Sequence, residues 1–354
     1  MIIRTGSNWP RRSRCRVLLA LSALACLPAG AQHATEDKAE ANWKLVCRQA
    51  MAQPLAARTP AGPLTQDELK DCDETALYYG QGAKPDYAAA LQCGWFERAH
   101  PQNGDANLFH GPGVLAMLYA NGRGVPRDYD LAIRFACEID WAANAEFESR
   151  VGHLERLRET HPPNASFDLC DDITSGASQG FCASVRSTGR DVVRDGQIAA
   201  IVARFPPAAK SAFLSLQSTE SAFEDARVSG EVDASGTARA ALQLDEQARL
   251  ADQFLINLQR FGSGSIPPAS ATDLSTLDRM LNEVYQKIQH SPASKWEYGT
   301  IKPEGIRDTE RKWVALLESW TALGRIAYPN LSRERIRAQL IRLRLHQLRS
   351  LDSD

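Results

Sequence analysis

The sequence lacks the features by which several large classes of protein are recognised. Its formal net charge is only −2, with 41 Lys and Arg against 43 Asp and Glu, whereas a nucleic-acid binder normally carries a strongly basic face. After residue 31 no apolar run approaches the roughly 20 residues that a membrane-spanning helix needs. No P-loop, dinucleotide fingerprint or H-E-x-x-H pattern occurs. These absences argue against a nucleic-acid partner and against a transmembrane segment, and nothing in the chain argues for an enzyme.

Residues 1–31 have the pattern of an export signal. Four arginines lie between residues 11 and 16, and an apolar run of nine residues follows at 17–25, which is too short to span a bilayer. Ala29-Gly30-Ala31 supplies the small residues that a signal peptidase needs. We expect cleavage after Ala31 and a periplasmic or secreted location. Removing the segment takes away five arginines and leaves 36 basic against 43 acidic residues, a net charge of −7.

Six cysteines follow the predicted signal, and an even number in an exported chain indicates disulfides. No C-x-x-C spacing occurs, so neither a zinc knuckle nor a thioredoxin-like redox pair is supported. For four of them the pairing is open. We favour Cys47–Cys72 with Cys93–Cys137, and Cys72–Cys93 is the alternative.

The hydrophobic pattern is helical almost throughout. Apolar residues recur at a spacing of three and four in the segments 206–229, 237–261, 303–324 and 332–351. No sustained period-two alternation occurs, so we predict an all-α fold. Linker-like breaks fall at 161–164, 262–268 and 291–294. The first break separates a short repeat-like domain (32–163) from a helical, bundle-like domain (164–354).

An internal repeat lies in the first domain. Five residues of one segment recur 42 residues later, Gly80, Gly82, Asp86, Tyr87 and Ala90 matching Gly122, Gly124, Asp128, Tyr129 and Ala132. The pattern predicts a helix, a glycine turn with unusual φ, and a second helix starting near the aspartate. The stretch 118–129, Leu-Tyr-Ala-Asn-Gly-Arg-Gly-Val-Pro-Arg-Asp-Tyr, resembles a Sel-one-like repeat, a relative of the tetratricopeptide repeat, and about two copies are present. Such arrays usually need three or more units, so we expect support from a helix near residues 43–51, from disulfides or from the second domain.

The second domain resembles the LprI-type lysozyme-inhibitor family, which are small exported helical proteins of bacterial envelopes. Three segments carry the resemblance: Cys170-Asp171-Asp172-Ile173-Thr174 leading to Cys182, Leu281-Asn282-Glu283-Val284-Tyr285, and the stretch from Ile306 to Trp313 with the arginine-rich C-terminal helix. The resemblance implies a structural disulfide between Cys170 and Cys182. Residues 183–262 are an insertion relative to the family unit, and the family's cysteine after the tryptophan is missing here.

The resemblance implies an exported, non-enzymatic protein that binds lysozyme or a related muramidase and protects the cell envelope. The alternative is an envelope scaffold that binds a protein partner through its repeats. Trp296 and Tyr298, which follow the break at 291–294, are the candidate partner-contact loop, because exposed aromatic residues commonly carry interface energy.

No catalytic residues, cofactor or metal ligands are expected. His153 and His161 with nearby Glu155 and Glu159 could in principle hold a metal, but solvated helix residues explain them better. Adjacent acids such as Asp73-Glu74 are interpreted as helix caps or solubilising groups. The arginines of the C-terminal helix are expected to pair with acidic residues of 206–261 rather than to bind a ligand.

Overall fold

The computed structural model describes residues 42–55, 60–101, 108–139 and 143–353. These residues form helices joined by turns, and no strand occurs among them, which confirms the predicted all-α class. The predicted export signal at 1–31 lies outside the described residues. Within the part of the chain that is described, no helix combines the length and the hydropathy needed to cross a membrane.

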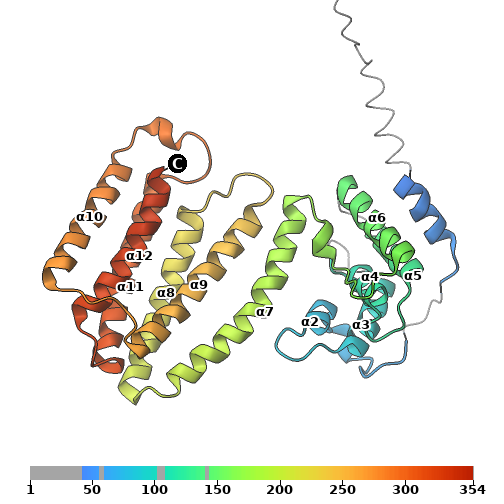
Figure 1. The fold of residues 1–354 in the computed structure, drawn as a ribbon, viewed down its shortest axis with the longest axis horizontal. Coiled ribbons are helices and arrows are strands. Elements are labelled where there is room, and N and C mark those ends of the chain that lie inside the picture. Colours follow the sequence, from blue (N-terminus) through green and yellow to red (C-terminus); the bar gives the residue numbers. More distant parts are fainter. Residues whose placement is uncertain (1–41, 56–59, 102–107, 140–142, 354) are drawn as a thin grey trace, which may run out of the picture. The chain divides into compact units, whose positions relative to one another are not determined.

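The N-terminal part begins with a helix at 42–52 and continues through short helices (Figure 1). These are α2 (Glu74–Tyr79), α3 (Tyr87–Ala99), α4 (Gly111–Asn121), α5 (Tyr129–Glu138) and α6 (Asn144–Thr160), with 3-10 turns η1 (Glu68–Lys70) and η2 (Leu169–Asp172). Helix α4 is apolar on nearly every side, so it is buried at the centre of the first hydrophobic core. This core extends past residue 163, because Phe167, Leu169 and Cys182 are members of it. The division at 163/164 stays a prediction. Buried residues up to Cys182 belong to the first core, and those from Ala209 onward belong to the second.

The two repeat copies have the same local geometry. Gly80 and Gly122 end α2 and α4 in the left-handed conformation, with φ of 71° and 63°, which a residue with a Cβ rarely adopts. Asp86 and Asp128 then cap α3 and α5 by accepting a hydrogen bond from the backbone N–H three residues later. The expected glycine turn with unusual φ is confirmed, and both second helices begin directly after the predicted aspartates.

Three disulfides staple the first core, but the favoured pairing of two of them is wrong. The structure joins Cys47 to Cys137 and Cys72 to Cys93, with Cα–Cα distances of 5.5 and 6.1 Å. The glycine turn folds α2 back on α3, which brings Cys72 beside Cys93. The helix at 42–52 packs instead near α5, where Arg134 donates to the carbonyl oxygens of Ala50, Met51 and Gln53. Cys170 pairs with Cys182 as the resemblance implies.

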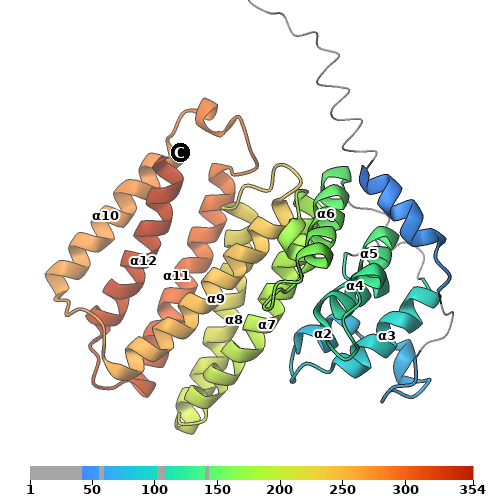
Figure 2. The same cartoon turned by 45° about the vertical axis from the view of Figure 1, so that its right-hand side comes forward.

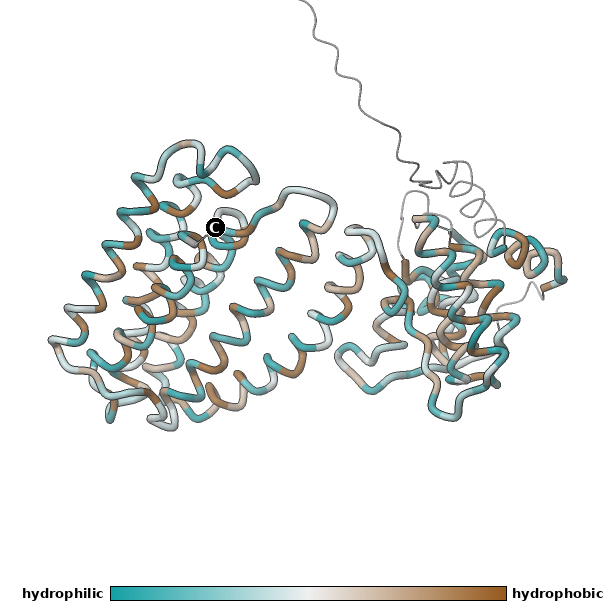
Figure 3. Tube along the Cα trace, turned by 45° about the horizontal axis from the view of Figure 1, so that its top comes forward, coloured by the Kyte–Doolittle hydropathy of each residue, from teal (hydrophilic) through white to brown (hydrophobic). Residues whose placement is uncertain are grey.

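Long amphipathic helices form the rest of the chain and enclose a second core (Figures 1 and 2). They are α7 (Gly176–Val202), α8 (Pro207–Gly230), α9 (Arg239–Ser263), α10 (Ala271–Gln289), α11 (Pro303–Ala327) and α12 (Arg333–Ser353), with the 3-10 turn η3 (Ala293–Trp296) before α11. Apolar and polar residues are interspersed along each of these helices (Figure 3). Helix α8 packs on α11, α7 on α9, and α10 on α12. The ends of α8, α9, α11 and α12 differ from the predicted bounds by at most three residues.

The second core contains a buried ion-pair network. The Arg344 side chain of α12 is 0% exposed and donates from both terminal nitrogens to the Glu231 carboxylate, at 2.6 and 2.9 Å. Its Nε donates to Glu310 of α11 at 2.9 Å. Arg227 of α8 donates to Glu231 and to Glu246 of α9. One connected set of charges therefore joins α8, α9, α11 and α12. Arg344 pairs with an acid of 206–261 as predicted, whereas Arg337 pairs with Glu318 and Arg335 donates to backbone carbonyl oxygens.

We expect Arg344→Met to lower the free energy of unfolding by about 3–5 kcal/mol, because it leaves the Glu231 and Glu310 carboxylates buried without their main cation. Urea denaturation followed by circular dichroism measures this change. The matched control is Arg279→Met, which removes an exposed pair with Glu283 and should change stability by less than about 1 kcal/mol. Equal losses in the two variants would contradict a central role for the network.

Candidate functional site

A groove of about 470 Å³ lies between α10, α11 and α12 in the second half of the chain. Leu281, Trp313 and Leu317 supply apolar lining, and Tyr285 lies on the α10 side. Val314, which is 48% exposed, gives the groove an apolar surface open to solvent. A concave surface with an apolar lining and a few polar groups is typical of a binding site.

The groove collects residues from two of the segments that carry the family resemblance. Asn282 and Tyr285 belong to the segment on α10, and Arg307, Arg311 and Trp313 belong to the segment on α11. The two segments are separate helical motifs in the sequence. The fold places them on one surface.

The polar groups of the groove are held by neighbouring side chains. Arg307 donates to the Gln289 side-chain oxygen at 2.9 Å, and the Gln289 amide donates to the carbonyl oxygen of Pro303. Arg337 of α12 pairs with Glu318 at 2.6 Å. The contacts of Arg307 and Gln289 hold the end of the groove at the start of α11, and the Arg337–Glu318 pair lies further along the helix.

The candidate contact loop enters α11 at that same end. Thr300 binds the connection between α8 and α9, because its backbone N–H donates to Asp233 at 3.0 Å and its hydroxyl accepts from the Ala234 N–H at 2.7 Å. Lys302 donates to the carbonyl oxygens of Trp296 and Gly299. The loop is therefore anchored on both sides of residues 297–299.

The two aromatic residues expected in this loop have different positions. Tyr298 is 85% exposed, and its role as a partner contact stays a prediction. Trp296 is only 9% exposed and belongs to the second core, so the expectation of an exposed side chain there is wrong. The reason is local: residues 293–296 form a 3-10 turn directly after Pro292, and the turn directs the indole into the core.

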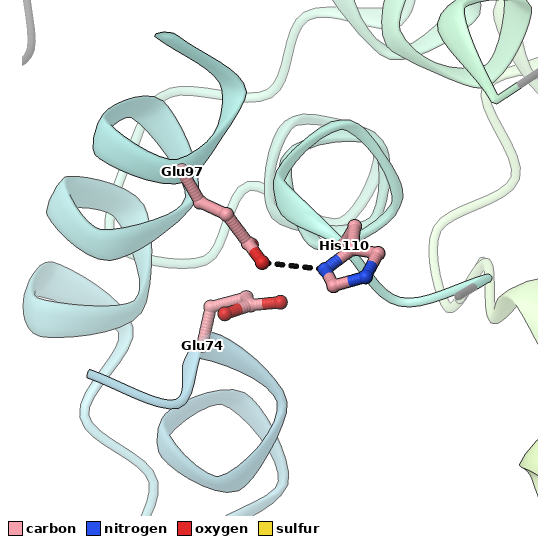
Figure 4. A group of neighbouring side chains, drawn as sticks. All are labelled: Glu74, Glu97 and His110. Carbon is pink, nitrogen blue, oxygen red and sulfur yellow. Dashed lines mark hydrogen bonds and ion pairs between the residues drawn. The ribbon is translucent and has the colours of Figure 1, made fainter. Parts of the chain in front are cut away.

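A second polar cluster, which sequence reasoning missed, lies in the first core. Glu74 is the first residue of α2, Glu97 lies near the end of α3, and His110 is the N-cap of α4. Nδ1 of His110 lies 2.5 Å from Glu97 Oε1, and the Gly111 N–H donates to Glu97 Oε2 at 2.7 Å. Figure 4 shows the Glu74 carboxyl group directed toward this pair. The three residues share no recognisable spacing, so no sequence signal marks the cluster.

The close crossing of α3 and α4 places the cluster. A Cβ on Gly111 would lie 2.4 Å from the Gly94 carbonyl oxygen, so only glycine permits this approach. Asp73 caps α2 by accepting from the Ala76 N–H, which confirms its interpretation as a helix cap. Its neighbour Glu74 instead points inward and is 5% exposed.

Burial raises the pKa of Glu74 to about 9, and a hydrogen bond with Glu97 and the negative charge of Glu97 act in the same direction. Burial opposes ionisation of Glu97 too, but hydrogen bonds from His110 and Glu74 hold its pKa below the usual value. The two carboxyl groups therefore differ in protonation. Glu74 keeps its proton at neutral pH and donates it to the ionised Glu97.

Other candidate residues have structural contacts. His153 binds Asp172 through Nδ1 at 2.8 Å, while His161 ends α6 in the left-handed conformation. Residues 176–180 spell G-x-S-x-G, a pattern that marks a nucleophile when an exposed serine follows a strand. Here the segment is the first turn of α7, and buried Ser178 donates to Glu146 at 2.7 Å. Ser178 therefore has a structural contact in this chain, and the pattern does not mark a nucleophile.

No protein-family model, curated protein or solved structure matches the chain. The two family resemblances therefore remain predictions. The function has to be inferred from the groove, the anchored loop and the polar cluster themselves.

We expect Glu74→Gln to flatten the pH dependence of stability. A folded-state pKa of about 9 lies above the ordinary value of 4.5, so Glu74 stabilises the fold below pH 4.5. That contribution is lost as the pH rises through about 9. Glutamine keeps a donor toward Glu97 and does not ionise.

Urea denaturation at about pH 5.5 and about pH 8.5 measures this effect, with the exposed Glu283→Gln as control. Glu220, whose pKa burial raises to about 8, is present in every variant and cancels from the comparison. If Glu74→Gln and wild type lose the same stability between the two pH values, the assigned protonation state is wrong.

Proposed function

We propose that this chain is an exported, non-enzymatic binding protein that inhibits lysozyme or a related muramidase through the loop at 297–301 and the adjoining end of the groove. The observation that carries the proposal is Tyr298, which is 85% exposed on a loop held on both sides. Because the backbone on both sides of Tyr298 is already anchored, less chain entropy is lost on binding, and large aromatic residues dominate interface energies. The resemblance to the lysozyme-inhibitor family names the class of partner.

The chemistry of the partner fits a protruding loop. Enzymes that cleave glycosidic bonds place two carboxyl groups across a sugar-binding cleft. A tyrosine inserted into that cleft would exclude the sugar, and its hydroxyl could hydrogen-bond to the groups that otherwise bind the glycan. Inhibition of this kind needs shape and anchoring but no catalytic group on the inhibitor.

Three disulfides support the proposed location, because such bonds persist in oxidising compartments. The predicted net charge of −7 after signal removal would speed encounter with a basic partner. Part of the positive charge of the C-terminal helix is engaged inside the protein. Arg335 donates to the carbonyl oxygens of Gly264 and Ile266, and Arg344 is buried with Glu231.

Titration of a panel of lysozymes with the oxidised protein, using hydrolysis of purified cell wall as the readout, tests the proposal. We expect stoichiometric loss of activity for at least one class. Tyr298→Ala should weaken that inhibition about 30-fold or more, the effect of a hot-spot residue worth about 2 kcal/mol.

The matched control is Leu214→Ala, which truncates an exposed apolar side chain of α8 that is 67% exposed. It should inhibit as wild type does. No inhibition across the panel would overturn the muramidase proposal and favour a scaffold that acts through the repeats. Inhibition that survives Tyr298→Ala unchanged would move the contact surface away from the loop.

A further inference from the structure

The cluster of Glu74, Glu97 and His110 has the composition and compactness of a metal-binding site. Within the described residues it is the group in which three potential ligand atoms, two carboxylate oxygens and one imidazole nitrogen, all lie within 4.8 Å of one another. Carboxylate and imidazole ligands bind a transition-metal ion at about 2.0–2.2 Å. Ligands of one ion are then separated by about 3–4 Å, so the side chains need only small shifts to surround one.

The frame around the cluster is rigid, which reduces the cost of assembling a site. The Cys72–Cys93 disulfide joins the segment just before Glu74 to the helix turn that precedes Glu97. The Sγ atom of Cys93 itself lies 3.7 Å from Glu74 Oε2. The crossing of α3 and α4 at Gly94 and Gly111 fixes His110 against Glu97. Three elements of the chain thus hold one ligand each.

The charges of the cluster favour a divalent cation. Among the described residues, no lysine or arginine is hydrogen-bonded to either carboxylate of the cluster, and His110, the Gly111 N–H and the Cys93 sulfur contact them. Two carboxyl groups and an imidazole therefore meet without a neighbouring basic side chain. A divalent ion could bind both carboxylates and the imidazole nitrogen directly.

We propose that Glu74, Glu97 and His110 bind a divalent transition-metal ion of the Zn²⁺ type. A ligand set of one imidazole and two carboxylates suits Zn²⁺ better than Ca²⁺, which prefers six to eight oxygen ligands. Three protein ligands leave a coordination position for water or for a group from a partner. The proposal is independent of muramidase inhibition, because the cluster belongs to the first core and the loop to the second.

Isothermal titration of tag-free, EDTA-treated, oxidised full-length protein with ZnCl₂ tests the proposal. We expect one equivalent of Zn²⁺ to bind, with weaker binding at lower pH, because protons compete with the metal for carboxylate and imidazole ligands. Ca²⁺ should bind at least about tenfold more weakly than Zn²⁺. Equal affinity for the two ions would overturn the proposed ligand set.

Glu74→Gln and His110→Ala should each weaken Zn²⁺ binding by more than about 10–100-fold. A loss of that size follows the mutation of a residue that only hydrogen-bonds to a metal ligand, and removal of a ligand itself should cost more. His290→Ala and Glu283→Gln remove an exposed histidine and an exposed acid of the second half, and both should bind as wild type does. Unchanged binding in Glu74→Gln and His110→Ala, or loss in the controls, would overturn the assignment.

A second readout does not depend on the stability of the variants. Co²⁺ added to the wild-type protein should give visible d–d absorption whose intensity reports a low coordination number, and Zn²⁺ should displace it. Reduction of the disulfides should weaken binding, because Cys72–Cys93 braces two of the ligands. Absence of Zn²⁺ binding by the folded wild-type protein, at concentrations where exposed histidines already respond, would refute the site.

Discussion

Arg344 enters the interior of the C-terminal helices with its charge intact, and the arrangement of those helices follows from the need to satisfy it. A buried cation is tolerated only when carboxylates surround it with good geometry. Glu231 at the end of α8 and Glu310 on α11 supply them, and Arg227 binds the other side of Glu231. Sliding α11 or α12 along its neighbours would break several charge-assisted bonds at once. The register of these helices is therefore set by electrostatics as well as by packing.

The groove depends on this register. Glu310 both binds Arg344 and lines the groove, so the charge network and the candidate binding surface share a residue. The contact loop is tied to the same framework from the other side, because Asp233 follows Glu231 closely in the chain and binds Thr300. The buried charge network thus positions a surface to which it contributes one residue, Glu310.

The first half uses a different device for the same purpose. Its helices are short, and a helix of six residues such as α2 has little stability alone. Disulfides and the close glycine crossing of α3 and α4 hold these helices together. That rigidity also permits charged side chains to meet at low exposure, where a proton or a metal ion must neutralise them.

Much of the fold was predictable from local pattern. Helices α8, α9, α11 and α12 could be predicted from their apolar periodicity, and the turns between α2 and α3 and between α4 and α5 from the repeat glycines and aspartates. Helix α7 was not predicted, because it contains several glycines, and it is stabilised by packing on α9. The disulfide pairing also lay beyond the sequence, since it depends on which helices become neighbours.

By itself, the sequence determined the all-α class, the glycine turns and the helix caps, since each rests on residues within a few positions of one another. Only the tertiary structure decided that Trp296 is buried while Tyr298 is exposed, and that two family-like segments line one groove. It alone brought Glu74, Glu97 and His110 together from three helices. The physical reason is the same in each case: burial and charge pairing depend on contacts between segments far apart in the chain, and no short-range pattern encodes those contacts.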